Sequence, residues 1–302
     1  MRRILSVLLT LLIAAAMAGC GGPGKDKVIT VGSKSFTEQY IIGNIITMLL
    51  EEQGFRVQER FGVGSMIARQ GLLTRQLDMY AEYTGTAWTL FHHHEEKVTD
   101  PHKLYRLVKQ EDLEKHGLVW LQMTGVNNTY ALAIPSNATQ KYGTTLSSLA
   151  RYVNTHDEDV VFGIAHEFYH RPDGFKKMLA HYNMNIDEAN IKTMDIGLSF
   201  ESISRGQIDV AMVYATDGKL KKYNLKVLAD DKKFFPIYTL CVVTTREAIE
   251  KYPEIPQILN PVATILDNET MQILNYQVDA LGKPSRLVAE EFLKAKGLLK
   301  NN

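Results

Sequence analysis

The chain has 302 residues, of which 45% are hydrophobic and 23% are charged. This composition is typical of a globular protein with one or two domains. Lys and Arg together number 34, and Asp and Glu also number 34, so we expect no general basic surface. The balance argues against nucleic acid as the main partner, because nucleic-acid binding depends on clustered positive charge.

The N-terminal segment has the composition of a secretory signal. Two arginines precede an apolar run over residues 4–17, which is too short to span a membrane comfortably. Small residues then lead to Cys20, an order that resembles the bacterial lipobox. We therefore expect a lipoprotein signal peptide over residues 1–19, lipidation of Cys20 and a Gly-rich tether over residues 20–27. An ordinary signal peptide with a chance cysteine is the alternative.

This signal predicts an extracytoplasmic protein that a lipid anchor alone attaches to the cell membrane. In a Gram-negative cell the protein would face the periplasm.

Strands and helices alternate after the tether. Strands are expected at residues 28–32, 55–61 and 77–83, and helices at residues 35–54 and 65–75. Ser35 and Glu38 have the spacing of a capping box at the start of the first helix. This β-α-β-α-β order predicts a mostly parallel sheet. A short helix at 86–90, a polar loop at 92–96, a helix at 100–116 and a strand at 118–121 follow.

The second half of the chain has the same rhythm. Residues 124–129 are rich in turn-forming residues, and we expect the chain to cross there to a second lobe. Strands are expected at 130–134, 160–164, 191–194, 208–214 and 226–228. Helices are expected at 145–153 and 200–205, and a third follows residues 171–174 and ends near residue 182. Residues 234–238 should cross back to a strand at 239–244, followed by helices at 256–266, 268–281 and 284–295. Lobe I would then comprise residues 28–127 and 239–302, and lobe II residues 128–238.

One sequence frame occurs twice. Gln76-Leu77-Asp78 is followed by Tyr83, and Gln207-Ile208-Asp209 is followed by Tyr214, so each tyrosine comes five residues after the aspartate. The copies are too far apart for a short-period repeat protein. They predict two α/β lobes, each of which ends a strand with a tyrosine, although helix–strand–turn units often look alike.

Polar and aromatic side chains collect at the predicted strand ends and lobe crossings. Ligands bind open α/β sheets at the carboxyl ends of the strands. The residues at such positions are Lys34, Tyr83, Thr86, Tyr130, Arg171, Tyr214 and Tyr238. Taken singly, each tyrosine is more simply explained as a core residue, and Lys34 or Arg171 as a solvated charge. Together, four tyrosines would attract a quaternary ammonium, at about 0.5–2 kcal/mol per contact, and the remaining three would suit a carboxylate.

Five motifs resemble the substrate-binding proteins of osmoprotectant ABC importers, which carry glycine betaine, choline, carnitine or proline betaine. The motifs are GSKSFTEQ (32–39), EYTGT (82–86), NTYA (128–131), RPDG (171–174) and YATDG (214–218). The resemblance implies a type II periplasmic-binding-protein fold, in which two α/β lobes close on the ligand. It also implies a monomer that delivers a quaternary ammonium compound to an ABC permease and its ATPase, without a cofactor or a metal.

The resemblance places the family's ligand-binding residues as well. The tyrosine cage falls on Tyr83, Tyr130, Tyr214 and Tyr238, and a backbone carbonyl near Asn128 would face the ammonium. The carboxylate contacts fall on Lys34, Thr86 and Arg171. Some members have glutamine at Lys34, so this position should affect ligand preference. Phe200 is assigned to packing, and the roles of His166 and His170 stay open.

Three other interpretations compete with ligand delivery. The His92-His93-His94-Glu95-Glu96 run resembles a metal site, but adjacent residues converge poorly on one ion, and a solvated loop is favoured. A hydrolase that uses the carboxylates of Glu82 and Asp217 is a second alternative, but the sequence contains no nucleophile motif. Cys241 is not expected to act as a nucleophile, because it lies in an apolar run that predicts a buried side chain. A ligand sensor of the same fold would differ from a transport protein only in its partner.

Overall fold

The computed structural model describes residues 27–156 and 160–300 of the chain. The predicted signal peptide, Cys20 and nearly all of the tether lie outside these residues. Within them, no helix combines the length and the apolar character that a membrane span needs.

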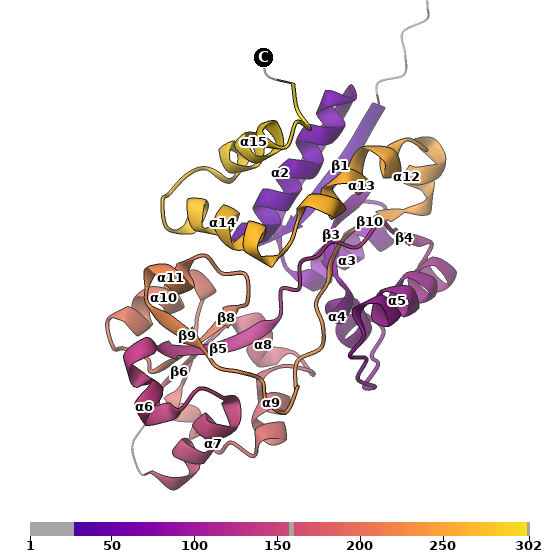
Figure 1. The fold of residues 1–302 in the computed structure, drawn as a ribbon. Helices are drawn as coiled ribbons and strands as arrows, with labels where there is room; N and C mark the ends of the chain where they lie inside the picture. Colours follow the sequence, from indigo (N-terminus) through magenta and orange to yellow (C-terminus); the bar gives the residue numbers. More distant parts are fainter. Residues whose placement is uncertain (1–26, 157–159, 301–302) are drawn as a thin grey trace, which may run out of the picture.

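The chain forms two five-stranded sheets in two lobes (Figure 1). The first sheet has the order β2-β1-β3-β10-β4. Its strands are β1 (Lys27–Lys34), β2 (Phe55–Val63), β3 (Met79–Tyr83), β4 (Leu118–Trp120) and β10 (Leu240–Thr245). Its helices are α2 (Thr37–Glu52), α3 (Ser65–Leu73), α4 (Thr84–Thr86), the π-helix η1 (Ala87–Phe91), α5 (Pro101–His116), α12 (Arg246–Lys251), α13 (Ile255–Ile265), α14 (Asn268–Asp279) and α15 (Ser285–Ala295).

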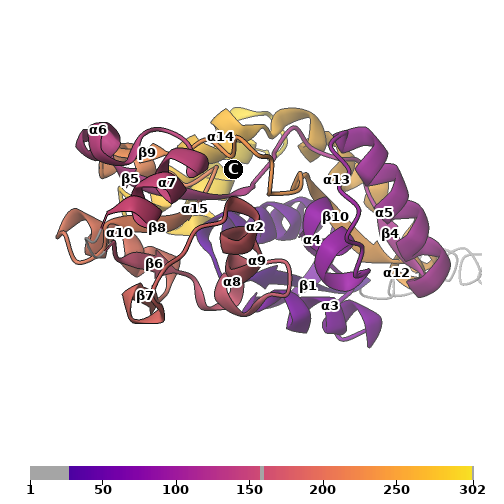
Figure 2. The ribbon, with the colours of Figure 1, turned by 90° about the horizontal axis from the view of Figure 1, so that it is seen from below.

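The second sheet has the order β7-β6-β8-β5-β9. Its strands are β5 (Tyr130–Pro135), β6 (Phe162–Ile164), β7 (Ile191–Thr193), β8 (Val210–Tyr214) and β9 (Leu225–Val227). Its helical segments are η2 (Ser136–Ala138), α6 (Thr139–Tyr142), α7 (Leu146–Thr155), α8 (His166–His170), α9 (Phe175–Tyr182), η3 (Glu188–Asn190), α10 (Ile196–Ser204) and α11 (Lys219–Lys222). Seen from below, the two sheets lie on opposite sides of the molecule (Figure 2).

The two sheets have the same topology. In the first, β1 pairs in parallel with β2 and β3, while β10 runs antiparallel to β3 and β4. In the second, β6 pairs in parallel with β7 and β8, while β5 runs antiparallel to β8 and β9. In each sheet, the antiparallel strand is the one that enters directly from the other lobe.

The repeated sequence frame has a structural role in both sheets. Asp78 accepts a hydrogen bond from the Thr30 backbone N–H at 2.7 Å, and Asp209 accepts one from the Val161 backbone N–H at 2.9 Å. Each aspartate therefore holds the start of its strand to the neighbouring parallel strand. Each frame then ends its strand with a tyrosine, Tyr83 on β3 and Tyr214 on β8.

The two segments that connect the lobes run side by side (Figure 1). Asn127 and Thr239 form an isolated antiparallel bridge. The Asn128 backbone N–H donates to the Tyr238 carbonyl at 3.1 Å, and the Tyr238 N–H donates to the Asn127 side chain at 2.8 Å. These bonds hold Asn128 and Tyr238 together at the point where the lobes meet.

Several local predictions differ from the structure. The predicted capping box is absent: Phe36 is the N-cap of α2 and makes no side-chain cap, because the Glu38 carboxylate is engaged by Tyr83 and Asn128. The helix predicted to begin at Phe200 begins one turn earlier, at Ile196. The prediction of a solvated loop is wrong for His92, whose side chain is only 1% exposed and contacts Asp112.

Two burial predictions are confirmed. Cys241 is fully buried on β10, as expected of a small hydrophobic residue. Phe200 is buried and packs in a cluster with Ala131 and Ile208 of lobe II.

Candidate functional site

A small cavity between the lobes brings the predicted ligand residues together. It has a volume of about 20 Å³ and is lined by Lys34, Phe36, Ser65, Tyr83, Thr86, Asn128, Tyr130, Glu167, Tyr214 and Tyr238. Seven of the eight residues predicted to bind the ligand are in this set, and Arg171 is the eighth. The cavity has room for about one water molecule, so a larger ligand requires the surrounding rings to move apart.

Aromatic rings form most of the cavity wall. The ring of Tyr130 lies 5.3 Å from that of Tyr214 and 5.3 Å from that of Tyr238, to which it is perpendicular. Phe36 stacks between Tyr214, at 5.1 Å, and Tyr83, at 6.4 Å. Several ring faces and edges thus converge on one point, the arrangement that favours a cation without hydrogen-bond donors.

The secondary structure explains this convergence. Tyr83 and Tyr214 are the last residues of the equivalent strands β3 and β8. Tyr130 is the first residue of the antiparallel strand β5, and it pairs directly with Tyr214. Tyr238 lies in the returning connection, beside Asn128. Each lobe therefore brings a strand-end tyrosine to the cleft, while the start of β5 and the returning connection supply the other two.

Arg171 extends the site beyond the rings. Its guanidinium lies 5.6 Å from the centre of the Tyr130 ring. Its Nε and Nη2 donate to Asp173 at 2.9 and 2.6 Å, and Asp173 in turn accepts from Thr89 of lobe I. Its Nη1 is buried, has no hydrogen bond to any described residue, and lies 3.7 Å from Glu167. This N–H group can donate a hydrogen bond to an additional anionic partner.

Lys34 is held by an ion pair inside lobe I. Its Nζ contacts Glu82 Oε1 at 2.5 Å, and both side chains are almost fully buried. The same Glu82 carboxylate accepts from the Tyr80 hydroxyl at 2.7 Å and from the Tyr83 backbone N–H at 2.7 Å. The Lys34 ammonium also lies 5.0 Å from the centre of the Tyr83 ring. Because the pair is buried, removing one partner would leave an uncompensated charge in the protein.

Glu38 connects both lobes below the rings. It accepts hydrogen bonds from the Tyr83 hydroxyl at 2.6 Å, the Asn128 side chain at 2.8 Å and the Thr216 hydroxyl of lobe II at 2.6 Å. Burial raises the pKa of the Glu38 carboxyl, and the hydrogen bonds from Thr216, Tyr83 and Asn128 partly offset this shift. Asn128 Oδ1 is buried and finds no donor among the described residues. It is an acceptor next to the aromatic rings.

Three residues that line the cavity are absent from the sequence prediction. Phe36 lies within the first family motif, Ser65 begins the helix after β2, and Glu167 lies in the helix after β6. Ser65 donates to Glu167 at 2.7 Å, which joins the two lobes across the cleft. The strand-end rule would have found Ser65 and Glu167, because both follow the carboxyl ends of parallel strands.

A larger cleft adjoins the small cavity. Its volume is about 470 Å³, and it shares four lining residues with the cavity, namely Phe36, Asn128, Glu167 and Tyr214. His166 and Phe200 also line it. Phe36 and Tyr214 therefore form a common wall between the ring cluster and the wider space between the lobes.

Residues 27–295 match the family model described as the substrate binding domain of ABC-type glycine betaine transport systems. The chain belongs to this family. It is 36% identical over 296 residues to a glycine-betaine-binding protein of Pseudomonas aeruginosa, covering 96% of this chain and 94% of that protein. The family consists of substrate-binding proteins of ABC osmoprotectant importers.

A relative from Helicobacter pylori has a different named ligand. It is described as an ergothioneine transport permease and ergothioneine binding protein, and it is 37% identical over 300 residues, covering 97% of this chain. The present chain spans 52% of the length of that relative. Among solved structures, a glycine betaine/carnitine/choline ABC transporter protein superposes with a TM-score of 0.73 at 29% identity, covering 89% of this chain and 99% of that one. These neighbours confirm the predicted two-lobed substrate-binding fold.

Proposed function

We propose that this protein binds a betaine, with a trimethylammonium group among the aromatic rings and a carboxylate at Arg171. The observation that carries the proposal is the cavity itself, which gathers Tyr83, Tyr130, Tyr214 and Tyr238 from both lobes. The free Nη1 of Arg171 lies beside the same rings. The two halves of the site therefore match the two charged ends of one small zwitterion.

The rings explain selectivity for a quaternary ammonium. Each ring face attracts a cation by about 0.5–2 kcal/mol, and more when water is excluded. Sodium, potassium and primary amines hold their water more strongly and would lose more hydration than the rings return. A trimethylammonium group is weakly hydrated and offers no donor that needs a partner. It is the cation that this wall of rings accommodates best.

The carboxylate end is assigned to Arg171, with support from Lys34 and Thr86. Arg171 is already oriented by its two bonds to Asp173, so its remaining donor is fixed before a ligand arrives. Lys34 lies at the cavity with one bond to Glu82 and two further donors. A ligand carboxylate between these cations would form charge-assisted hydrogen bonds.

The named ligands of two relatives support the betaine class. Glycine betaine and ergothioneine both carry a trimethylammonium group and a carboxylate, although ergothioneine has a bulky side group. The ring cluster would bind the trimethylammonium group that both ligands share. The adjoining cleft of about 470 Å³ offers space for a side group on the far side of Phe36 and Tyr214.

The cellular role follows from the family and from the N-terminal signal. We propose an extracytoplasmic protein, anchored through lipidated Cys20, that delivers its ligand as a monomer to an ABC permease and its ATPase. Lobe I, residues 28–127 and 239–302, and lobe II, residues 128–238, would move as two units about the paired connections. Movement of these units opens and closes the cavity.

The direct test is calorimetric titration of the purified protein with glycine betaine, carnitine, ergothioneine and choline. If the betaines bind at least tenfold more tightly than choline, the result supports both the ring cluster and the carboxylate contact. Choline binding equally well supports the rings and removes the carboxylate contact. Binding of none of the four would refute the proposal.

Two substitutions separate the halves of the site. Tyr214→Ala should weaken betaines and choline alike by about 3- to 30-fold, which corresponds to one cation–π contact, whereas Tyr214→Phe should retain most of the affinity. Arg171→Ala should weaken glycine betaine at least tenfold and choline much less. Equal losses for both ligands would mean that Arg171 only holds the lobes together.

A further inference from the structure

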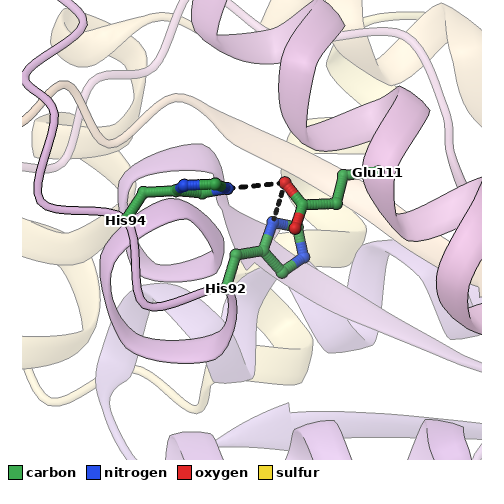
Figure 3. Close-up of side chains that lie close together, drawn as sticks. All are labelled: His92, His94 and Glu111. Atoms are coloured by element: carbon green, nitrogen blue, oxygen red, sulfur yellow. Dashed lines mark hydrogen bonds and ion pairs between the residues drawn. The ribbon is translucent and has the colours of Figure 1, made fainter.

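The connection between η1 and α5 forms a second cluster of polar side chains, away from the ring cavity. His92 and His94 come from the connection, and Glu111 comes from α5 (Figure 3). One nitrogen of each histidine and one Glu111 oxygen lie within 4.8 Å of one another. The His94 Nε2 to Glu111 Oε2 distance is 2.7 Å, and the His92 Nδ1 to Glu111 Oε2 distance is 3.3 Å.

The backbone explains how two nearly adjacent histidines face the same carboxylate. His93 has a φ of 58°, a left-handed conformation that turns the chain between them. The His92 N–H donates to the Ala87 carbonyl at 2.9 Å, and the His94 N–H donates to the Trp88 carbonyl at 3.1 Å. The His94 ring also stacks on Trp88 at 3.7 Å. Both imidazoles are therefore held by η1 before any ion binds.

The hydrogen bonds of Asp112 define the tautomer of His92. Asp112 accepts both forks of the Arg69 guanidinium and the Trp120 indole N–H, at 2.6 Å for the indole. Paired with Arg69, this carboxylate is an acceptor only. The His92 Nε2, which lies 2.9 Å from Asp112 Oδ1, must therefore carry the proton and donate it. This leaves the His92 Nδ1 as the ring nitrogen that faces Glu111.

The buried His92 Nδ1 lacks a hydrogen-bond partner among the described residues. The His92 side chain is 1% exposed, so water does not compensate for the missing bond. A neutral His92 would direct a nitrogen lone pair at a Glu111 oxygen only 3.3 Å away. Two acceptors at this distance repel each other unless a proton on Nδ1 or a metal cation lies between them. The His92 Nδ1 therefore needs either a proton or a metal cation on the side that faces Glu111.

We propose that His92 Nδ1, His94 Nε2 and Glu111 Oε2 bind a zinc ion, with water as the fourth ligand. Two imidazoles and one carboxylate form a typical zinc donor set. In a tetrahedral site with bonds of about 2.0–2.1 Å, ligand atoms are about 3.3 Å apart. The His92–Glu111 pair already has this separation, while the His94–Glu111 pair must widen by about 0.6 Å.

The surroundings fit a metal site in two further respects. Asp112 holds the second nitrogen of His92, which is the outer hydrogen bond that zinc-bound histidines usually make. The side chain of His94 is 36% exposed and lines a cleft of about 390 Å³, which provides a path for the ion. Lys115 binds the other Glu111 oxygen at 2.7 Å, and His116 stacks near His92 at 6.4 Å. Together with Arg69, which binds Asp112, these two side chains are basic groups near the cluster.

The ion would tie the connection to α5 and so stabilise this side of lobe I. The same connection reaches lobe II, because Glu95 lies 3.9 Å from Lys177 and Thr89 of η1 donates to Asp173. The proposed site is separate from the ring cavity and does not depend on the identity of the transported ligand.

The test uses the protein without an affinity tag, after removal of metal with a chelator. Zinc should bind with one equivalent per chain in calorimetry and raise the melting temperature. Cobalt, used as a probe, should give the strong visible absorption of a tetrahedral site. His94→Gln and Glu111→Gln should each lower zinc affinity at least tenfold. Both positions are near the surface, so these variants should fold.

His93→Asn is the matched control, because asparagine tolerates the left-handed backbone and His93 contributes no ligand atom to the cluster. The His93→Asn variant should bind zinc with an affinity within about twofold of the wild type, which is the range expected for a position that does not interact with the site. Absence of stoichiometric binding would overturn the proposal. So would a loss in His93→Asn that equals the loss in the other variants, because it would indicate adventitious binding to the histidine run.

Discussion

At the scale of single residues, Asp217 is a carboxyl group whose ionisation changes on folding. Its carboxylate accepts a hydrogen bond from the Tyr214 backbone N–H at 2.7 Å, in the turn that follows β8. Burial, together with the nearby Asp279 and Glu38, raises its pKa from 3.8 to about 7. The folded protein therefore binds a proton here at pH values where the unfolded chain has released it.

This shift predicts a pH-dependent effect of Asp217→Asn. The folded-state pKa is raised, so the stabilising contribution is full below about pH 4, declines as the pH rises and is lost above about pH 7. Asparagine retains an acceptor for the Tyr214 N–H but cannot ionise. We expect the variant to match the wild type at pH 4 and to exceed it at pH 8 by about 1–2 kcal/mol, a value reduced because Asp217 is partly exposed. Chemical denaturation at both pH values measures this, and a pH-independent difference would contradict it.

At the scale of secondary-structure elements, the position of Tyr238 depends on the glycine in the short helix α4. A Cβ on Gly85 would lie 2.7 Å from Tyr238 Cδ1 and 2.8 Å from the Ile237 backbone oxygen. The backbone oxygen cannot rotate away, so the returning connection or α4 would have to shift. The turn after β3 and the connection from lobe II therefore fit together only without a side chain at Gly85.

Gly85→Ala should consequently displace the Tyr238 ring from the cavity wall. We expect a loss of about 1–3 kcal/mol in stability from overpacking, and a loss of about 3- to 30-fold in affinity for every quaternary ligand, equal to one cation–π contact. Gly197→Ala is the control, since a Cβ there meets nothing within 4 Å in α10. Thermal melting and calorimetry of both variants give the comparison. Unchanged ligand affinity in Gly85→Ala would show that Tyr238 is not part of the ligand site.

The ends of the strands could be predicted from the sequence, whereas contacts between distant elements could not. The strand ends were predictable, because apolar runs of four to eight residues ending in polar residues indicate where a buried strand stops. That rule located Tyr83 and Tyr214. The environment of His92 was not predictable, because it contacts Asp112 of α5, which Arg69 of α3 and Trp120 of β4 hold in place. A histidine run alone cannot reveal such long-range contacts.

The predicted capping box failed for a related reason. Ser35 and Glu38 have the correct spacing, but Glu38 makes its shortest contacts to Tyr83 of the same lobe and, across the cleft, to Thr216. Tertiary hydrogen bonds to a buried carboxylate outweigh a local cap of about 1 kcal/mol. Ligand and hinge residues are where local sequence rules are expected to fail, because their contacts are chosen for function.

At the scale of the whole molecule, a few hydrogen bonds join the lobes around the cavity. Ser65 of lobe I donates to Glu167 of lobe II at 2.7 Å, and Thr216 of lobe II donates to Glu38 of lobe I at 2.6 Å. Thr89 of lobe I donates to Asp173 of lobe II. In the lobe movement proposed above, a ligand enters the 20 Å³ cavity when these bonds open, and the bonds re-form around it when the lobes close. Their strength therefore contributes to affinity without any contact to the ligand.

Thr216→Val tests this link between lobe closure and affinity. Valine has the shape of threonine but lacks the hydroxyl that donates to Glu38. Removing the donor of a buried hydrogen bond costs about 1–3 kcal/mol, so we expect a loss of about fivefold or more in affinity for glycine betaine and choline alike. The equal loss distinguishes this variant from Arg171→Ala, which should discriminate between the two ligands. Thr216→Ser keeps the hydroxyl and serves as the control. If Thr216→Val binds both ligands as tightly as Thr216→Ser, the bond to Glu38 does not stabilise the closed lobes, and affinity resides in the ring cavity alone.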